Sequence, residues 1–90
     1  MKGRQRREAV FDPSFVEDLT HWMRTDRKRA LRILGLAEAV LRDPFDGIGK
    51  PAPLCRELAG RWSRRIDAEH RLVYQVADTR VHFLAGRYHC

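Results

Sequence analysis

Four arginines toward the C-terminus, Arg64, Arg65, Arg71 and Arg87, are the residues with the clearest chemical potential in this 90-residue chain. Arginine carries a planar fork of donors that suits bidentate contact with a phosphate or a carboxylate. The penultimate residue, His89, adds the side chain that most often acts as a general acid or base near neutral pH. Together these residue types favour a site that holds an anionic group.

Each of these residues also has a plainer interpretation. The arginines fit a solvated basic sheet face that pairs with nearby carboxylates, and His89 fits a frayed chain end. The aromatic residues Trp62, Tyr74 and Tyr88 are able to stack on RNA bases. Trp62 and Tyr74, however, fall on an apolar register that favours the core. The residue types alone therefore leave both interpretations open.

The composition indicates an anionic partner. The 18 Lys and Arg residues exceed the 12 Asp and Glu residues and give a formal net charge of +6, which attracts polyanions. With Cys55 and Cys90 as the two cysteines, there is neither a disulfide framework nor a C-x-x-C pair. The sequence shows neither a secretory-signal pattern nor an apolar stretch of about 18 residues. We therefore expect a cytoplasmic protein that binds nucleic acid or an acidic protein.

Two amphipathic helices are predicted ahead of the arginines. Asp12 is suited to cap a helix whose first residue is Pro13, and Asp26 is suited to cap a second helix that Pro44 ends. Apolar residues recur at helical spacing in both segments. The residues predicted to face the core are Phe15, Val16, Leu19, Trp22, Met23, Ala30, Ile33, Leu34, Ala37, Val40 and Leu41. These two segments predict a helical hairpin.

Strands are predicted on both sides of this hairpin. Residues 9–11 suit one strand, and apolar residues alternate with period two over 62–66, 72–76 and 81–85, which predicts three antiparallel strands. Between them, PFDGIGKPAPLC at 44–55 is rich in proline and glycine and is expected to be a stiff loop, neither helix nor central strand. Its GIGK segment lacks the spacing and the following Ser or Thr of a phosphate-binding loop.

The order β, α, α, β, β, β predicts an α+β fold in which the helical hairpin covers one face of a mainly antiparallel sheet. The other face is then left for function. We expect residues 1–8 to be a basic flexible tail and residues 9–90 to form one domain. The four histidines and two cysteines lack a recognisable zinc spacing, so we expect neither a metal nor a cofactor.

Three stretches carry a resemblance to a known family: RDPFDGIGKPAPL at 42–54, ELAGRWSRRIDAEHRLVYQV at 57–76 and RYHC at 87–90. They resemble the YoeB or Txe toxins of the RelE/ParE superfamily of bacterial toxin-antitoxin systems, and the match runs from about residue 9 to the C-terminus. The resemblance implies the same order of strands and helices. It also implies a toxin that enters the ribosomal A site and cuts mRNA, and an antitoxin that wraps the toxin and blocks its cleft.

The chemistry that the resemblance implies is attack of the RNA 2′-OH on the adjacent phosphorus, which leaves a 2′,3′-cyclic phosphate. This reaction needs a base for the hydroxyl, cations for the phosphorane and an acid for the leaving 5′-oxygen. By position, Arg71 matches the family's catalytic arginine, His89 its general acid and Arg65 a basic residue of the same cleft. We therefore predict Arg71 and His89 as catalytic residues. The residues predicted to contact RNA are Lys50, Arg64, Arg65, Arg87 and Tyr88.

The chain departs from the family pattern at three positions. Ala52 stands where the family has a glutamate proposed as the general base, Cys55 stands where a basic or polar residue is common, and Cys90 replaces a terminal tyrosine. A methyl group cannot take a proton, so we expect a ribosome-dependent mRNA endonuclease with weakened activity. The alternative is a catalytically impaired toxin homologue that binds the ribosome or sequesters an antitoxin.

The resemblance also sets the expected partners. They are a cognate acidic antitoxin protein, the ribosome and the mRNA in its A site, with no membrane. A homodimer is a further assembly open to the chain.

Overall fold

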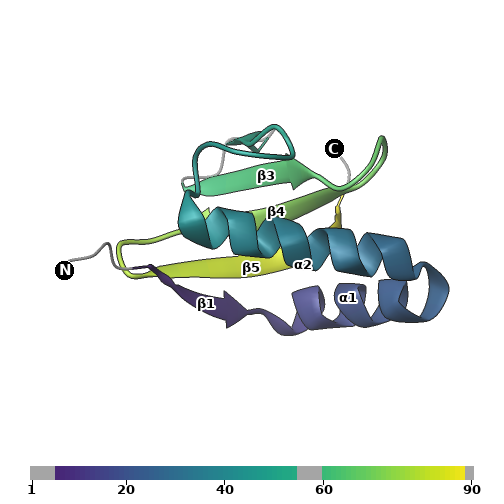
Figure 1. Cartoon of the computed structure of the whole chain (residues 1–90). Coiled ribbons are helices and arrows are strands. Elements are labelled where there is room, and N and C mark those ends of the chain that lie inside the picture. Colours follow the sequence, from purple (N-terminus) through teal and green to yellow (C-terminus); the bar gives the residue numbers. More distant parts are fainter. Residues whose placement is uncertain (1–5, 55–59, 89–90) are drawn as a thin grey trace.

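The protein folds as one five-stranded sheet with two helices packed on one of its faces (Figure 1). The structure is a computed structural model and describes residues 6–54 and 60–88. Along the chain the elements are β1 (Glu8–Phe11), α1 (Pro13–Thr25), α2 (Arg27–Arg42), β2 (Ala52–Pro53), β3 (Arg61–Arg65), β4 (Arg71–Val76) and β5 (Arg80–Tyr88). Across the sheet the order is β1-β5-β4-β3-β2. Strand β1 runs parallel to β5 and the other neighbours are antiparallel, so the predicted α+β fold is confirmed.

The two helices begin and end where the sequence indicates. The Asp12 carboxylate accepts a hydrogen bond from the backbone N–H two residues further on, and Pro13 is the first helical residue. The Asp26 carboxylate caps α2 in the same manner, because it accepts a hydrogen bond from the Arg29 backbone N–H. Asp43 is extended, as expected for the residue before Pro44, and ends α2. Neither α1 nor α2, the helices of the described residues, is long and apolar enough to cross a membrane.

The core lies between the helical hairpin and the sheet. Its buried residues are Phe15, Trp22, Ala30, Ile33, Leu36, Ala37, Val40, Ile66, Leu72, Tyr74, Val81 and Phe83. The inward orientation predicted for Val16, Met23 and Leu34 is wrong, because these side chains are 46%, 62% and 47% exposed. Each lies one residue, about 100° around the helix, from a buried neighbour, so the packed stripe is narrower than the apolar one. Leu36, which the prediction missed, is fully buried.

The loop between α2 and β3 ends in a short edge strand that was not predicted. In β2, Ala52 lies opposite Ser63 and Pro53 lies opposite Trp62. Proline has no N–H to donate to a neighbouring strand, so Pro53 is tolerated at the edge of the sheet. At the other edge, β1 begins at Glu8, one residue before the predicted strand at 9–11. The sheet is thus wider than the sequence pattern suggested.

Candidate functional site

Three of the predicted site residues lie side by side on adjacent strands. Arg65 of β3 is paired with Arg71 of β4, and Arg71 is paired with Tyr88 of β5. Paired residues of antiparallel strands project from the same face of a sheet, and successive residues alternate between faces. Leu72, which follows Arg71, is in the core under the helices, so the three side chains project from the face away from the helices. We call Arg65, Arg71 and Tyr88 the cationic row.

Small side chains form the next row on the same face. Ala52, Ser63, Val73 and Ala85 are paired in sequence across β2, β3, β4 and β5. Arg71 is linked to this row, because its Nη1 donates to Ser63 Oγ at 3.5 Å. Ser63 was not predicted as a site residue, although it lies inside the WSRRI motif. The cationic row therefore borders a floor of small residues, and the family's glutamate position, Ala52, lies on that floor.

Lys50, in the loop before β2, adopts an unusual backbone conformation. Its φ is +51°, in the left-handed region that side chains other than glycine seldom adopt. The preceding carbonyl, that of Gly49, accepts a hydrogen bond from the Arg65 N–H at 2.6 Å. The Lys50 side chain is exposed and lies two residues before Ala52. A loop held to the end of β3 thus presents this predicted RNA contact to solvent.

Arg64 does not join the cationic row, so its predicted contact with RNA needs correction. It is fully buried on the helix side of the sheet. Its guanidinium donates to the backbone carbonyls of Asp43, Asp46 and Ile48. Its Nε donates to Tyr74 Oη at 3.2 Å. The cause is strand alternation, because Arg64 follows Trp62 and precedes Ile66 on the apolar register of β3. Its donors hold the loop after α2 against the sheet.

Tyr74 adds a further buried hydrogen bond between the sheet and the loop after α2. Its hydroxyl donates to the Pro44 carbonyl at 2.7 Å while it accepts from Arg64. Burial raises the pKa of the Tyr74 phenol, and the hydrogen bond and charge of Arg64 oppose that rise without cancelling it. Trp62 is half-buried and packs against the core. The core interpretation of Tyr74 and Trp62 is therefore confirmed.

Arg87 also lies apart from the cationic row. Its side chain is exposed, and its guanidinium carbon lies 5.9 Å from the centre of the Trp22 ring on α1. The guanidinium of Arg29 lies over the same ring at 4.8 Å. Arg87 is thus a solvent-facing cation beside α1, next in the chain to Tyr88 of the cationic row.

Three predicted positions, Cys55, His89 and Cys90, lie outside the described residues. Within residues 6–54 and 60–88, His, Cys, Asp and Glu side chains form no group of three that would hold a metal ion.

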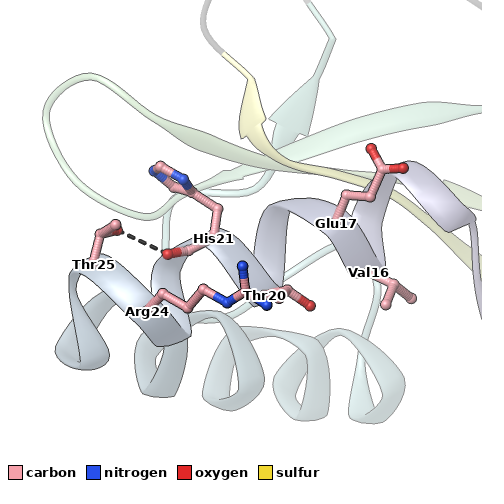
Figure 2. Close-up of a pocket in the computed structure, with 6 residues that line it drawn as sticks. All are labelled: Val16, Glu17, Thr20, His21, Arg24 and Thr25. Carbon is pink, nitrogen blue, oxygen red and sulfur yellow. Dashed lines mark hydrogen bonds between the residues drawn. The ribbon is translucent and has the colours of Figure 1, made fainter.

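A hollow on the surface of α1 contains none of the predicted site residues. Figure 2 shows the side chains that line it, which all belong to this helix: Val16, Glu17, Thr20, His21, Arg24 and Thr25. Thr25 Oγ1 donates to the His21 carbonyl at 2.8 Å, which is a local helix contact. The candidate site is therefore the cationic row and its floor.

The fold places the chain in a structural class. The YoeB dimer from Staphylococcus aureus aligns with a TM-score of 0.87 and 37% identity, over 94% of this chain and 99% of that one. The YoeB-YefM heterotetrameric complex from the same organism aligns with a TM-score of 0.80, 37% identity and the same coverage. The β-α-α-β-β-β-β arrangement is thus that of RelE/ParE-superfamily toxins.

The sequence comparison specifies the family. Residues 11–90 match the model of the YoeB-like toxin of bacterial type II toxin-antitoxin systems. Toxin RelK of Mycobacterium tuberculosis is 55% identical over 83 residues, which covers 92% of this chain and 98% of that protein. Toxin YoeB of Escherichia coli K12 is 47% identical over 82 residues, with coverage of 91% and 98%. The chain belongs to the YoeB-like toxin family.

Proposed function

We propose that this toxin is a ribosome-dependent endoribonuclease that cuts mRNA in the A site. The observation that carries the proposal is the cationic row: two arginines and a tyrosine on neighbouring strands of the face away from the helices. Arginine forks match the geometry of phosphate oxygens, and an aromatic ring beside them is able to stack on an unpaired base. The reaction takes place in the cytoplasm, where translating ribosomes are found.

The proposed reaction assigns a role to each group. The 2′-oxygen attacks the adjacent phosphorus and loses its proton, the P–O5′ bond breaks, and the leaving 5′-oxygen takes a proton. Arg71, with Arg65 beside it, stabilises the charge that accumulates on the phosphorane oxygens. His89, by its match to the family, donates the proton to the 5′-oxygen. The products are a 2′,3′-cyclic phosphate and a 5′-hydroxyl.

The residue at the family's glutamate position, Ala52, favours a lowered rate of cleavage. Ala52 lies opposite Ser63, the residue whose hydroxyl Arg71 contacts, so a glutamate here would project from the same face as the arginines. Alanine supplies no acceptor for the 2′-OH proton, and that proton would have to leave to solvent. A positioned base typically contributes about 10² to 10⁴ in rate. This observation favours a second candidate function, a ribosome-binding or antitoxin-sequestering homologue with little activity.

The proposed regulator is an acidic antitoxin. The chain carries a net charge of +6, which steers an acidic polypeptide toward it. The Staphylococcus aureus relative is found in complex with YefM. An antitoxin segment laid over Arg65 and Arg71 would exclude the RNA phosphate by occupying the same donors.

Cleavage of mRNA on programmed ribosomes, read by primer extension, tests the proposal. Wild type should cut in the A site, and Arg71→Ala should lower the single-turnover rate by about 10² to 10³, the usual loss for one transition-state donor. Arg80→Ala is the matched control, because Arg80 is an exposed arginine at the opposite end of β5. Equal, measurable rates for wild type and Arg71→Ala would remove the role of Arg71, and no cleavage by wild type would reject the enzyme and leave the binding function.

A further inference from the structure

Strand β5 reaches the cationic row through two bulges. Its pairing with β4 runs Phe83 opposite Tyr74, Ala85 opposite Val73 and Tyr88 opposite Arg71. In a regular antiparallel ladder, one step along one strand matches one step back along the other. Counted from Phe83, Gly86 would then lie opposite Arg71. Each bulge inserts one extra residue into β5, so two insertions bring Tyr88 into the row.

Three polar side chains of α1 hold the bulged segment. Ser14 Oγ donates to the Leu84 carbonyl at 2.7 Å. The Asp18 carboxylate accepts from the Gly86 N–H at 2.9 Å, and Trp22 Nε1 donates to the Gly86 carbonyl at 2.8 Å. Ser14, Asp18 and Trp22 are spaced four residues apart, so they lie along one face of α1. We call these three residues the polar stripe.

The polar stripe satisfies backbone groups that the bulges affect. A bulge locally disrupts the ladder, and a buried N–H or carbonyl without a partner is costly. Both polar groups of the buried Gly86 are bonded by α1 side chains. A Cβ at this position would lie 3.3 Å from Ile33 Cδ1, so the close approach to the helices suits glycine. The contact between α1 and β5 therefore depends on the side chains of the polar stripe and on the glycine at position 86.

We propose that the polar stripe sets the register of β5 and thereby places Tyr88 opposite Arg71. Ser14, Asp18 and Trp22 are then positioning residues for the reaction, although none of them lies in the cationic row. The role in catalysis rests on the proposed RNA cleavage, because Tyr88 belongs to the row and directly precedes the expected general acid. The single hydroxyl proton of Ser14 is shared between the Leu84 carbonyl and the Asp12 carboxylate, whose oxygen lies 2.6 Å from Ser14 Oγ, so Asp18 and Trp22 give the more specific tests.

The test compares variants that remove one hydrogen bond with variants that keep it. Trp22→Phe removes the indole donor but keeps a ring for the neighbouring Arg29 and His70. Asp18→Leu removes the acceptor, whereas Asp18→Asn keeps an amide oxygen that is able to accept the Gly86 N–H. Glu17→Leu is the matched control, because it removes one negative charge from the exposed side of the same helix turn (Figure 2).

Two measurements follow each variant. The first is the set of cross-strand nuclear Overhauser effects between the backbones of Arg71 and Tyr88. The second is single-turnover cleavage at saturating ribosome, with ribosome affinity measured separately. Trp22→Phe and Asp18→Leu should lose the cross-strand signals and at least about tenfold in rate, with affinity within about twofold, because small displacements of reacting groups strongly lower rates. Asp18→Asn and Glu17→Leu should behave as wild type.

Several results would overturn the proposal. Retention of the Arg71–Tyr88 signals in both Trp22→Phe and Asp18→Leu would show that the stripe does not set the register. Lost signals with an unchanged rate would remove the positioning role, as would equal damage from Asp18→Asn and Asp18→Leu. If Asp18→Leu fails to fold, Trp22→Phe carries the test. If wild type does not cleave RNA, the proposed function fails, while the cross-strand signals still decide whether the stripe sets the register.

Discussion

Arg64 and Arg65 are consecutive residues of β3 whose side chains lie on opposite faces of the sheet. Arg64 is fully buried and donates to three loop carbonyls and to the Tyr74 hydroxyl. Arg65 is exposed and lies beside Arg71 in the cationic row. The residue type is the same, and the alternation of side chains along a strand separates the two environments. Within β3, the environment of each of these two arginines is therefore decided by the face of the sheet from which it projects.

The two faces also differ in how far their cations are already bonded. Arg64 uses Nε and both terminal nitrogens on neutral oxygen acceptors, which compensates for the loss of water around a buried charge. On the other face, the contact of Arg71 with Ser63 is 3.5 Å long, at the weak limit of a hydrogen bond. A guanidinium held so loosely is ready to bind a phosphate. One face thus uses arginine for stability, and the other holds the arginines of the proposed site.

The largest effect that this comparison predicts is on stability. Arg64→Met should lower the free energy of unfolding by about 3 to 5 kcal/mol, because several buried oxygens lose their donor at about 1–3 kcal/mol each. Arg65→Met, the matched control one residue away, should change it by less than about 0.5 kcal/mol. Urea denaturation of both variants provides the measurement. Equal losses would show that the two faces are not separated as the structure indicates.

A smaller effect is expected from the partner of Arg64. Tyr74→Phe removes the donor to the Pro44 carbonyl and should cost about 2 kcal/mol. Because the pKa of Tyr74 is raised in the fold, the unfolded chain ionises first as the pH rises above about 10. The wild-type protein should therefore lose stability through that range, and the Tyr74→Phe variant should lose less. Denaturant midpoints of both proteins, measured from about pH 8 to about pH 11, test this difference. Parallel curves would contradict the raised pKa.

The fold was largely predictable because its signals are local. Asp12, Pro13, Asp26 and Pro44 set the helix boundaries through capping and proline geometry, which depend on neighbouring residues alone. The alternation of apolar residues similarly located β3, β4 and β5. Strand β2 was not predictable in this way, since two residues with a proline carry no periodic signal. It is defined by its pairing with β3, which is distant information that these two residues do not carry.

The site was predictable only in part, because pairing between strands is not local. The family pattern pointed to Arg65 and Arg71, and residue type pointed to Tyr88. The two bulges that align Tyr88 with Arg71 left no sequence signal other than Gly86. Arg64 was assigned to RNA by residue type, although its place on the apolar register predicts burial. A basic side chain on a core register was the signal that indicated a structural role.

The smallest effect predicted here adds a carboxylate to the face away from the helices. Ala52→Glu should raise the single-turnover rate of mRNA cleavage by at least about tenfold, or about 1.4 kcal/mol in the barrier, because it supplies a base for the 2′-OH. Ribosome affinity should remain nearly unchanged, since the gain belongs to the transition state. Ala52→Gln is the matched control, because it has the same size as glutamate but takes no proton at neutral pH. Single-turnover cleavage of ribosome-bound mRNA measures both variants.

The outcome of this substitution separates the remaining explanations for the cationic row. A rise with glutamate but not with glutamine would show that Ala52 limits turnover and that Arg65 and Arg71 already hold the phosphate in place. If wild type cuts as fast as Ala52→Glu, a carboxylate is dispensable and the arginines carry the reaction without one. If neither protein cuts while both bind the ribosome, the face away from the helices binds a ligand without transforming it. None of the arginines would then take part in a reaction. Arg64 and Arg65 would differ only in what they bind, which is loop carbonyls for Arg64 and RNA or an acidic protein for Arg65.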